Sequence, residues 1–198
     1  MSIAIALRQI LAADHCYDPR DRGLLPADHD LDAPISFREI VEKAGAEDAI
    51  WCFSILPDHD NLKRRFAVDC AERVKHLMAD ERSLNALTVA RRHAMGQATD
   101  KELDEAWYAA EAASDDGVWT EVADAAQAAA LAAVESDTRD AAEAAAWAAA
   151  GAAVGVGGEA ENEAENAAWN AAYDSEQAWQ AARLIELTET GEWSPVAE

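Results

Sequence analysis

The sequence predicts an all-α protein, an antiparallel helical bundle whose Ala-rich C-terminal helices pack closely together. Three observations favour this fold class. Apolar residues recur at helical spacing along most of the 198 residues. Patterns typical of helix capping stand where several of these stretches begin. No sustained alternation of β-branched and polar residues marks a strand, so no sheet is expected.

The first half of the chain begins with a short helix and a long connection. Residues 2–12 have the spacing of a helix, and residues 13–35 hold three Pro, one Gly and many Asp. A connection of this length in a compact domain is often functional. Ser36 and Glu39 then form a capping box for a helix that ends before Gly45.

Three more helices are expected before residue 98. A short apolar helix at 48–56 ends at Pro57, and longer helices cover 60–79 and 81–95, where Gly96 closes the last one. The helix at 60–79 has one apolar stripe, which consists of Leu62, Phe66, Cys70, Val74 and Leu77.

The second half is rich in Ala and Trp, with 33 Ala among its 98 residues and six of the seven Trp. Ala has the highest intrinsic helix propensity, so this composition favours helices. Thr99 and Glu102 form a second capping box. Helices are expected at 99–114, 118–135, 137–154 and 159–190, with a Gly-rich break at 155–158 and Gly191 at the end.

Small residues recur in the last helix at alternating steps of four and three. This spacing predicts a seam along which neighbouring helix axes approach closely. The seam consists of Ala164, Ala168, Ala171, Ser175, Ala178, Ala182 and Ile185. Four aromatic residues are expected to anchor neighbouring helices to one another: Trp107, Trp147, Trp169 and Trp179.

Negative charge is concentrated in the second half of the chain. The protein has 39 acidic and 16 basic residues, and its formal net charge is −23. The first 100 residues carry 17 acids and 13 bases, whereas the rest carries 22 acids and only three bases, Lys101, Arg139 and Arg183. Direct binding to nucleic acid or to anionic membranes is disfavoured, because both need Lys and Arg. The chain divides into a near-neutral part, 1–98, and an acidic part, 99–198, or forms one continuous domain.

Cysteine usage and hydropathy indicate a cytoplasmic protein. No apolar run is long enough for a transmembrane helix, and the first residues lack the pattern of a secretory signal. The three cysteines are expected to be reduced thiols. Cys52 and Cys70 lie on apolar helical stretches and should be buried, whereas Cys16 beside His15 is the one thiol to test for reactivity.

No pattern predicts a catalytic, metal or cofactor site. Asp-His-Asp triplets stand at 28–30 and 58–60, but adjacent residues do not converge on one metal ion. Asp58 or Asp60 suits a helix cap instead. No phosphate-binding Gly-rich motif follows a strand. Two basic clusters are expected to pair with nearby acids: Lys63-Arg64-Arg65 and Arg91-Arg92-His93.

A further pattern covers residues 48–114, about a third of the chain. Its parts are Phe66-Ala67, Cys70-Ala71-Glu72-Arg73, Ala90-Arg91-Arg92, Ala94-Met95-Gly96, Thr99 and Glu102-Leu103. In these residues the stretch resembles an Ala-rich helical family of immunity proteins from phages and bacteria. The resemblance implies an association with phages and mobile elements. Small acidic proteins of that origin are often inhibitors of host defence, anti-CRISPR proteins among them.

The acidic residues of the second half are the strongest functional signal. Carboxylates three or four positions apart on a helix stand about 5–6 Å apart, so an array of them resembles the phosphates of a nucleic acid. A basic nucleic-acid-processing protein or complex of the host would bind this array as a decoy. The predicted partner-binding residues are Glu102, Asp104, Glu105, Glu111, Asp115, Asp116, Glu121, Asp124, Asp137, Asp140, Glu143, Glu159, Glu161, Glu163 and Glu165.

Other functions stay open beside the decoy. The protein is alternatively an immunity protein that neutralises a toxin, or a structural or scaffolding helical protein. The acidic face alternatively serves solubility alone. An enzyme is not expected. The connection at 13–35 offers another contact surface through Tyr17, Leu24 and Leu25.

Overall fold

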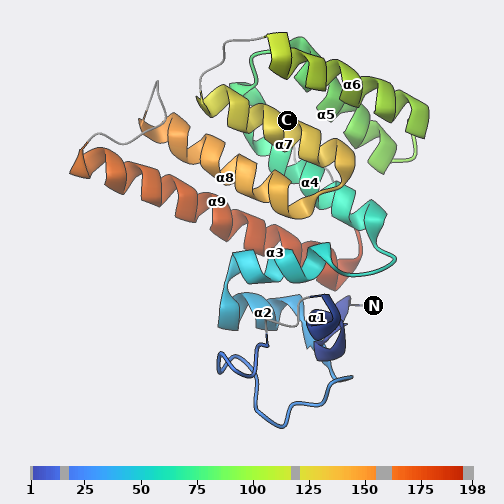
Figure 1. Cartoon of the computed structure of the whole chain (residues 1–198), viewed down its shortest axis with the longest axis vertical. Coiled ribbons are helices and arrows are strands. Elements are labelled where there is room, and N and C mark those ends of the chain that lie inside the picture. The colour runs from blue at the N-terminus through green and yellow to red at the C-terminus, as the bar shows by residue number, and fades with distance from the viewer. Residues whose placement is uncertain (1, 14–17, 117–120, 155–161, 194–198) are drawn as a thin grey trace.

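Helices make up most of the computed structural model, which describes residues 2–13, 18–116, 121–154 and 162–193 (Figure 1). The elements, in chain order, are β1 (Ala4–Ala6), α1 (Leu7–Ala13), β2 (Pro34–Ser36), α2 (Phe37–Ala44), α3 (Ala46–Ser54), α4 (Asp60–Val74), the 3-10 turn η1 (Lys75–Leu77), α5 (Glu81–Ala94), α6 (Asp100–Asp116), α7 (Glu121–Glu135), α8 (Thr138–Val154) and α9 (Glu163–Thr190). The prediction of an all-α helical bundle is confirmed. None of the described helices is long and apolar enough to cross a membrane.

Helix α4 runs through the middle of the bundle. It packs against α5, α7, α8 and α9. In Figure 1, α5 and α6 lie at one end of the molecule, and α1 and α2 lie at the other. Helices α6, α7, α8 and α9 each contact the next in sequence, so the acidic half forms a row of adjacent helices.

The buried hydrophobic residues form one cluster that extends from Ile5 to Leu187. Within it the rings of Phe37 and Phe53, and those of Phe53 and Phe66, meet edge to face, with centroids 5.6 and 5.9 Å apart. These three rings join α2, α3 and α4. Edge-to-face aromatic pairs add about 0.5–1.5 kcal/mol each beyond the area that they bury.

Helices α7 and α8 pack through small side chains. Because Ala projects only one methyl group, two such helices approach closely and gain dispersion contacts along their length. The buried residues of α8 are Thr138, Ala141, Ala142, Ala145, Ala146, Ala148, Ala150 and Gly151. The expected Ala-rich packing is therefore present here, whereas the Gly-rich break at 155–158 lies outside the described residues.

A short two-stranded sheet replaces the first part of the helix expected at 2–12. β1 pairs with β2 in antiparallel register, which places Ile5 opposite Ile35. Both isoleucines are almost completely buried, and β-branched side chains suit such paired positions. The backbone N–H of Ile3 also donates to the carbonyl of Thr188 at 2.7 Å, which ties β1 to the end of α9.

Helix α4 begins at Asp60 as expected, but its capping residue and its C-terminal end differ from the prediction. His59 is the N-cap and makes no side-chain capping bond; its Nδ1 lies 2.6 Å from the carbonyl oxygen of Pro57, and Asp58 has a left-handed backbone (φ 61°). Neither Asp58 nor Asp60 is the cap. The α-helix ends at Val74 and continues as a 3-10 turn. The expected stripe is buried at Leu62, Phe66, Cys70 and Val74.

The capping signals of the other helices are accurate. The Thr99 hydroxyl accepts from the Glu102 N–H at 3.2 Å, and the Glu102 carboxylate accepts from the Thr99 N–H at 2.8 Å. The Ser36 hydroxyl accepts from the Glu39 N–H. Gly191 ends α9 in the left-handed conformation that favours glycine (φ 68°).

The small-residue seam predicted for α9 is wrong. Its Ala and Ser members are exposed, and Ile185 is only partly buried. The buried face of α9 consists instead of Glu176, Gln180, Ala181, Arg183, Leu184, Leu187 and Thr188. Polar side chains turn inward here because they find hydrogen-bonding partners on other helices.

Two ion pairs connect this face of α9 to α4. Arg183 donates to Asp69 at 2.8 Å, and these side chains are 9% and 1% exposed. Arg73 donates to Glu176 at 3.0 Å, and the Glu176 side chain is 3% exposed. Each helix therefore gives one carboxylate and one guanidinium to the other.

We expect the substitution Arg183→Met to lower the free energy of unfolding by about 3–5 kcal/mol, because it leaves the buried Asp69 carboxylate without its counterion. Urea denaturation followed by circular dichroism measures this loss. The matched control is Lys101→Met, which removes the exposed Lys101–Glu105 pair on α6 and should cost less than about 1 kcal/mol. Equal losses of free energy in both variants would show that the buried Arg183–Asp69 pair stabilises the fold no more than an exposed pair does.

Candidate partner-binding surface

The basic residues of the acidic half do little to neutralise its surface. Lys101 pairs with Glu105 on its own helix at 3.3 Å. Arg183 points inward to Asp69. Arg139 is exposed and makes no ion pair within the described part of the chain.

The basic residues of the first half are bound within the protein. The predicted basic clusters pair with acids in part: Lys63 with Asp60, Arg91 with Glu72, Arg92 with Glu102 and His93 with Asp100, whereas Arg65 donates to the carbonyl of Ala94. Arg64 lies within hydrogen-bonding distance of His93, at 2.8 Å. Further pairs are Arg8–Asp32, Arg20–Asp18, Arg22–Asp48, Arg38–Glu189, Lys43–Glu39, Lys75–Glu72 and Arg82–Asp80.

Six of the predicted partner-binding carboxylates are exposed and form no ion pair among the described residues. They are distributed over all four helices of the acidic half: Asp104 and Glu111 on α6, Asp124 on α7, Asp140 and Glu143 on α8, and Glu163 on α9. Asp104 and Glu111 are two turns, or about 10 Å, apart on one face. Adjacent helix axes lie about 8–10 Å apart, so neighbouring rows of carboxylates have a comparable spacing.

Three other predicted residues have structural roles. Glu102 accepts bonds from Thr99 and Arg92, and these bonds, first the one from the Thr99 backbone, hold the pKa of its carboxyl below the ordinary value. Asp137 caps α8 by accepting from the N–H groups of Arg139 and Asp140. Glu105 pairs with Lys101.

The remaining predicted residues are partly or wholly outside the description. Glu165 opens α9 and is partly buried. The side chains of Asp115, Asp116 and Glu121 are not among those described. Glu159 and Glu161 lie outside the described residues, and so do Cys16, His15 and Tyr17.

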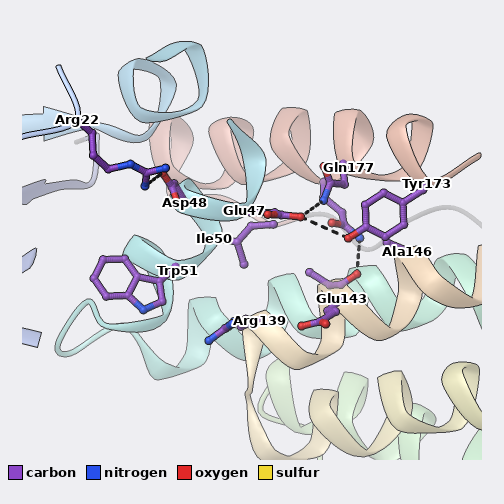
Figure 2. Close-up of a pocket in the computed structure, with 12 residues that line it drawn as sticks. Arg22, Glu47, Asp48, Ile50, Trp51, Arg139, Glu143, Ala146, Tyr173 and Gln177 are labelled. Atoms are coloured by element: carbon purple, nitrogen blue, oxygen red, sulfur yellow. Dashed lines mark hydrogen bonds and ion pairs between the residues drawn. The ribbon is translucent and has the colours of Figure 1, made fainter. Parts of the chain in front are cut away.

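A pocket that sequence reasoning missed lies between α3, α8 and α9. Its volume is about 400 Å³, within the range of about 300–1,000 Å³ typical of small-ligand sites. Figure 2 shows Arg22, Asp48 and Trp51 at one end, and Glu47, Tyr173 and Gln177 at the other. Glu143 is the one residue of the pocket lining that also belongs to the predicted partner-binding carboxylates.

Hydrogen bonds fix the acidic end of this pocket. Gln177 Nε2 donates to Glu47 Oε1 at 2.8 Å, and Tyr173 Oη donates to the same oxygen at 3.4 Å (Figure 2). Partial burial raises the pKa of Tyr173, and the negative charges of Glu47 and Glu143 raise it further. Both carboxylates therefore act on the phenol, which makes this end of the pocket electronegative.

An aromatic ladder continues from the pocket over α8 and α9. The ring of Tyr173 stacks on Trp169 with an interplanar angle of 11°, and Trp169 meets Trp147 edge to face. Trp147 is 52% exposed. Trp147 and Trp169 thus anchor α8 to α9 as predicted, but at the surface. Trp179 on α9 makes a cation–π contact with Arg73 on α4, whose guanidinium carbon lies 4.7 Å from the centre of the Trp179 ring.

The described thiols are buried, as predicted. Cys52 and Cys70 are at most 1% exposed. Burial, together with the charge of Asp48, raises the pKa of Cys52 to about 12. Burial also raises the pKa of Cys70 well above the ordinary value, and nearby Glu176 and Asp69 add to the effect. Both thiols therefore stay protonated and unreactive at neutral pH. Across the described ranges, no three His, Cys, Asp or Glu side chains come together in a way that could hold a metal ion.

The substitution Glu47→Gln should lower the pKa of Tyr173, because it keeps a hydrogen-bond acceptor and removes a negative charge that disfavours the phenolate. Tyrosinate absorbance during a pH titration, with Tyr173→Phe as the reference, measures this change. Glu163→Gln removes the same charge from an exposed site that does not line the pocket and should leave the pKa unchanged. An unaltered pKa in Glu47→Gln would contradict this account of the pocket.

Comparisons of the chain with protein-family models, with curated proteins and with solved structures gave no match. The resemblance of residues 48–114 to the immunity-protein family stays a prediction.

Proposed function

We propose that this protein is a binding protein, not an enzyme, that occupies the nucleic-acid site of a basic host protein or complex as an acidic decoy. It would act in the manner of phage inhibitors of host defence such as anti-CRISPR proteins. One observation carries the proposal. Six exposed carboxylates distributed over α6–α9 form no ion pair among the described residues, while most of the basic side chains of the described chain are bound internally.

A surface with unpaired carboxylates, in a protein whose own basic side chains are mostly bound internally, suits recognition by the Lys and Arg side chains of a partner. Nucleic-acid channels hold many such residues, and each contributes through long-range attraction to negative charge. The packed helices fix the backbone positions of these carboxylates, so binding to a partner has to order only the side chains. An exposed ion pair within the protein would compete with the partner, and the six carboxylates avoid that competition.

The first test is an affinity pull-down from host lysate, eluted in salt steps and read by mass spectrometry. We expect a basic nucleic-acid-processing protein or complex that is released at moderate salt, because contacts between exposed charges are screened beyond about 10 Å at 0.1 M salt. DNA or RNA should compete it off the column. A single toxin held through high salt would support the immunity function instead. Recovery of the chain alone would support a scaffold.

The second test is a charge-reversal series at Asp104→Lys, Glu111→Lys and Asp124→Lys. Each substitution should weaken binding to the captured partner by about tenfold at low salt, or about 1.4 kcal/mol. These residues have no ion pair to lose, so folding should be preserved, as thermal unfolding would check.

The matched control for this series is Asp28→Lys. It changes the net charge by the same amount, but it lies in the connection before β2 and not on α6–α9. The control should bind the partner almost as well as the unaltered protein. Equal weakening in the control would show that only net charge matters, and unchanged binding in the series would exclude α6 and α7 as the contact.

A further inference from the structure

We propose that the pocket between α3, α8 and α9 receives one arginine side chain of the partner. This inference rests on the proposed function, because it assigns the decoy a specific anchor in addition to its diffuse charge. It concerns a cavity with a defined shape and lining, about 400 Å³ in volume.

The first argument is the charge around the acidic end of the pocket. Glu47 and Glu143 both line the pocket, and the negative charges of both raise the pKa of Tyr173. Glu143 forms no ion pair among the described residues, and only one of the two Glu47 oxygens accepts the bonds from Gln177 and Tyr173. A cation that enters the cleft from outside would be attracted by both carboxylates.

The second argument is that, within the described part of the chain, neither of the two arginines that line the pocket, Arg22 and Arg139, forms an ion pair with its acidic end. Arg22 is bound to Asp48 at 3.3 Å, at the opposite end of the cleft (Figure 2). Arg139 lies one turn before Glu143 on α8, yet no ion pair joins the two. The acidic end therefore keeps acceptor capacity that the chain does not fill.

The third argument is the aromatic wall. Tyr173 and Trp51 are the aromatic residues that line the pocket, and stacking on Trp169 fixes the Tyr173 ring. Guanidinium groups stack on aromatic faces and at the same time donate in pairs to carboxylates, which an ammonium group does less well. Carboxylates beside aromatic rings thus match arginine in both shape and charge.

Titration of the isotope-labelled protein with N-acetyl-arginine methylamide tests this assignment by NMR. We expect saturable shifts of the Gln177 side-chain amide and the Trp169 indole, with a Kd of about 1 mM, as for a single small anchor. The neutral isostere N-acetyl-citrulline methylamide should produce no saturable shift. Equal binding of the two probes would overturn the proposal.

The variant Glu143→Gln should raise the Kd of the arginine probe at least fivefold, whereas Glu163→Gln, which is exposed on α9 outside the pocket, should leave it unchanged. Both positions are exposed, so both variants should fold. An unchanged Kd in Glu143→Gln, or an equal rise in both, would overturn the assignment.

The same variants separate this inference from the proposed function. If Glu143→Gln binds the captured partner with full affinity while Asp104→Lys and Glu111→Lys do not, the pocket is not the anchor and the decoy function stands. If the arginine probe binds the pocket but the charge-reversal series binds the partner unchanged, the decoy function fails and the pocket remains a guanidinium site.

Discussion

The register of α9 against α4 is the constraint on which the rest of the bundle depends. Asp69 and Arg73 on α4 meet Arg183 and Glu176 on α9, and this order along the two helices is possible only if they run antiparallel. Ala-rich surfaces look alike from one turn to the next, so packing alone specifies the register weakly. A slip of one turn would leave buried charges unpaired, at a cost of several kcal/mol. The same register brings the earlier turns of α9 against α3 and so builds the pocket.

Local signals in the sequence predicted the helices well, whereas the faces that these helices bury depend on partners far along the chain. The capping box at Thr99 and Glu102 and the glycine at position 191 could be found because the groups that bond are only a few residues apart. The buried face of α9 could not, since its Glu and Arg look like surface residues until α4 supplies their counterions. The pocket was missed for the same reason: its Glu, Tyr and Gln come from α3 and α9, which only tertiary packing brings together. β1 escaped notice because three residues are too few to show alternation.

The distribution of charge also depends on whether the two members of an ion pair lie close together or far apart along the chain. Most arginines and lysines of the first half lie beside an acid of their own neighbourhood or of the next helix, and they are neutralised there. The acidic half has too few cations to do this, and one of its three is turned into the core. The molecule therefore presents carboxylates outward on α6–α9, while the pocket adds aromatic surface to the same charge. A partner that carries both exposed arginines and a basic channel would find both features on neighbouring helices.

The bond between Ile3 and Thr188 joins the beginning of the described chain to the end of its last helix. A polypeptide leaves the ribosome from its N-terminus, so β1 is synthesised before α9. The bond from Ile3 to Thr188 can form only after α9 has been made. Until then the apolar sides of α2 to α4 stay open to chaperones and proteases, and the earlier helices have no partner for Asp69 and Arg73. The native packing of α4 therefore requires α9. A chain that stops before α9 would leave Asp69 and Arg73 without their counterions and the apolar surface that α9 covers exposed.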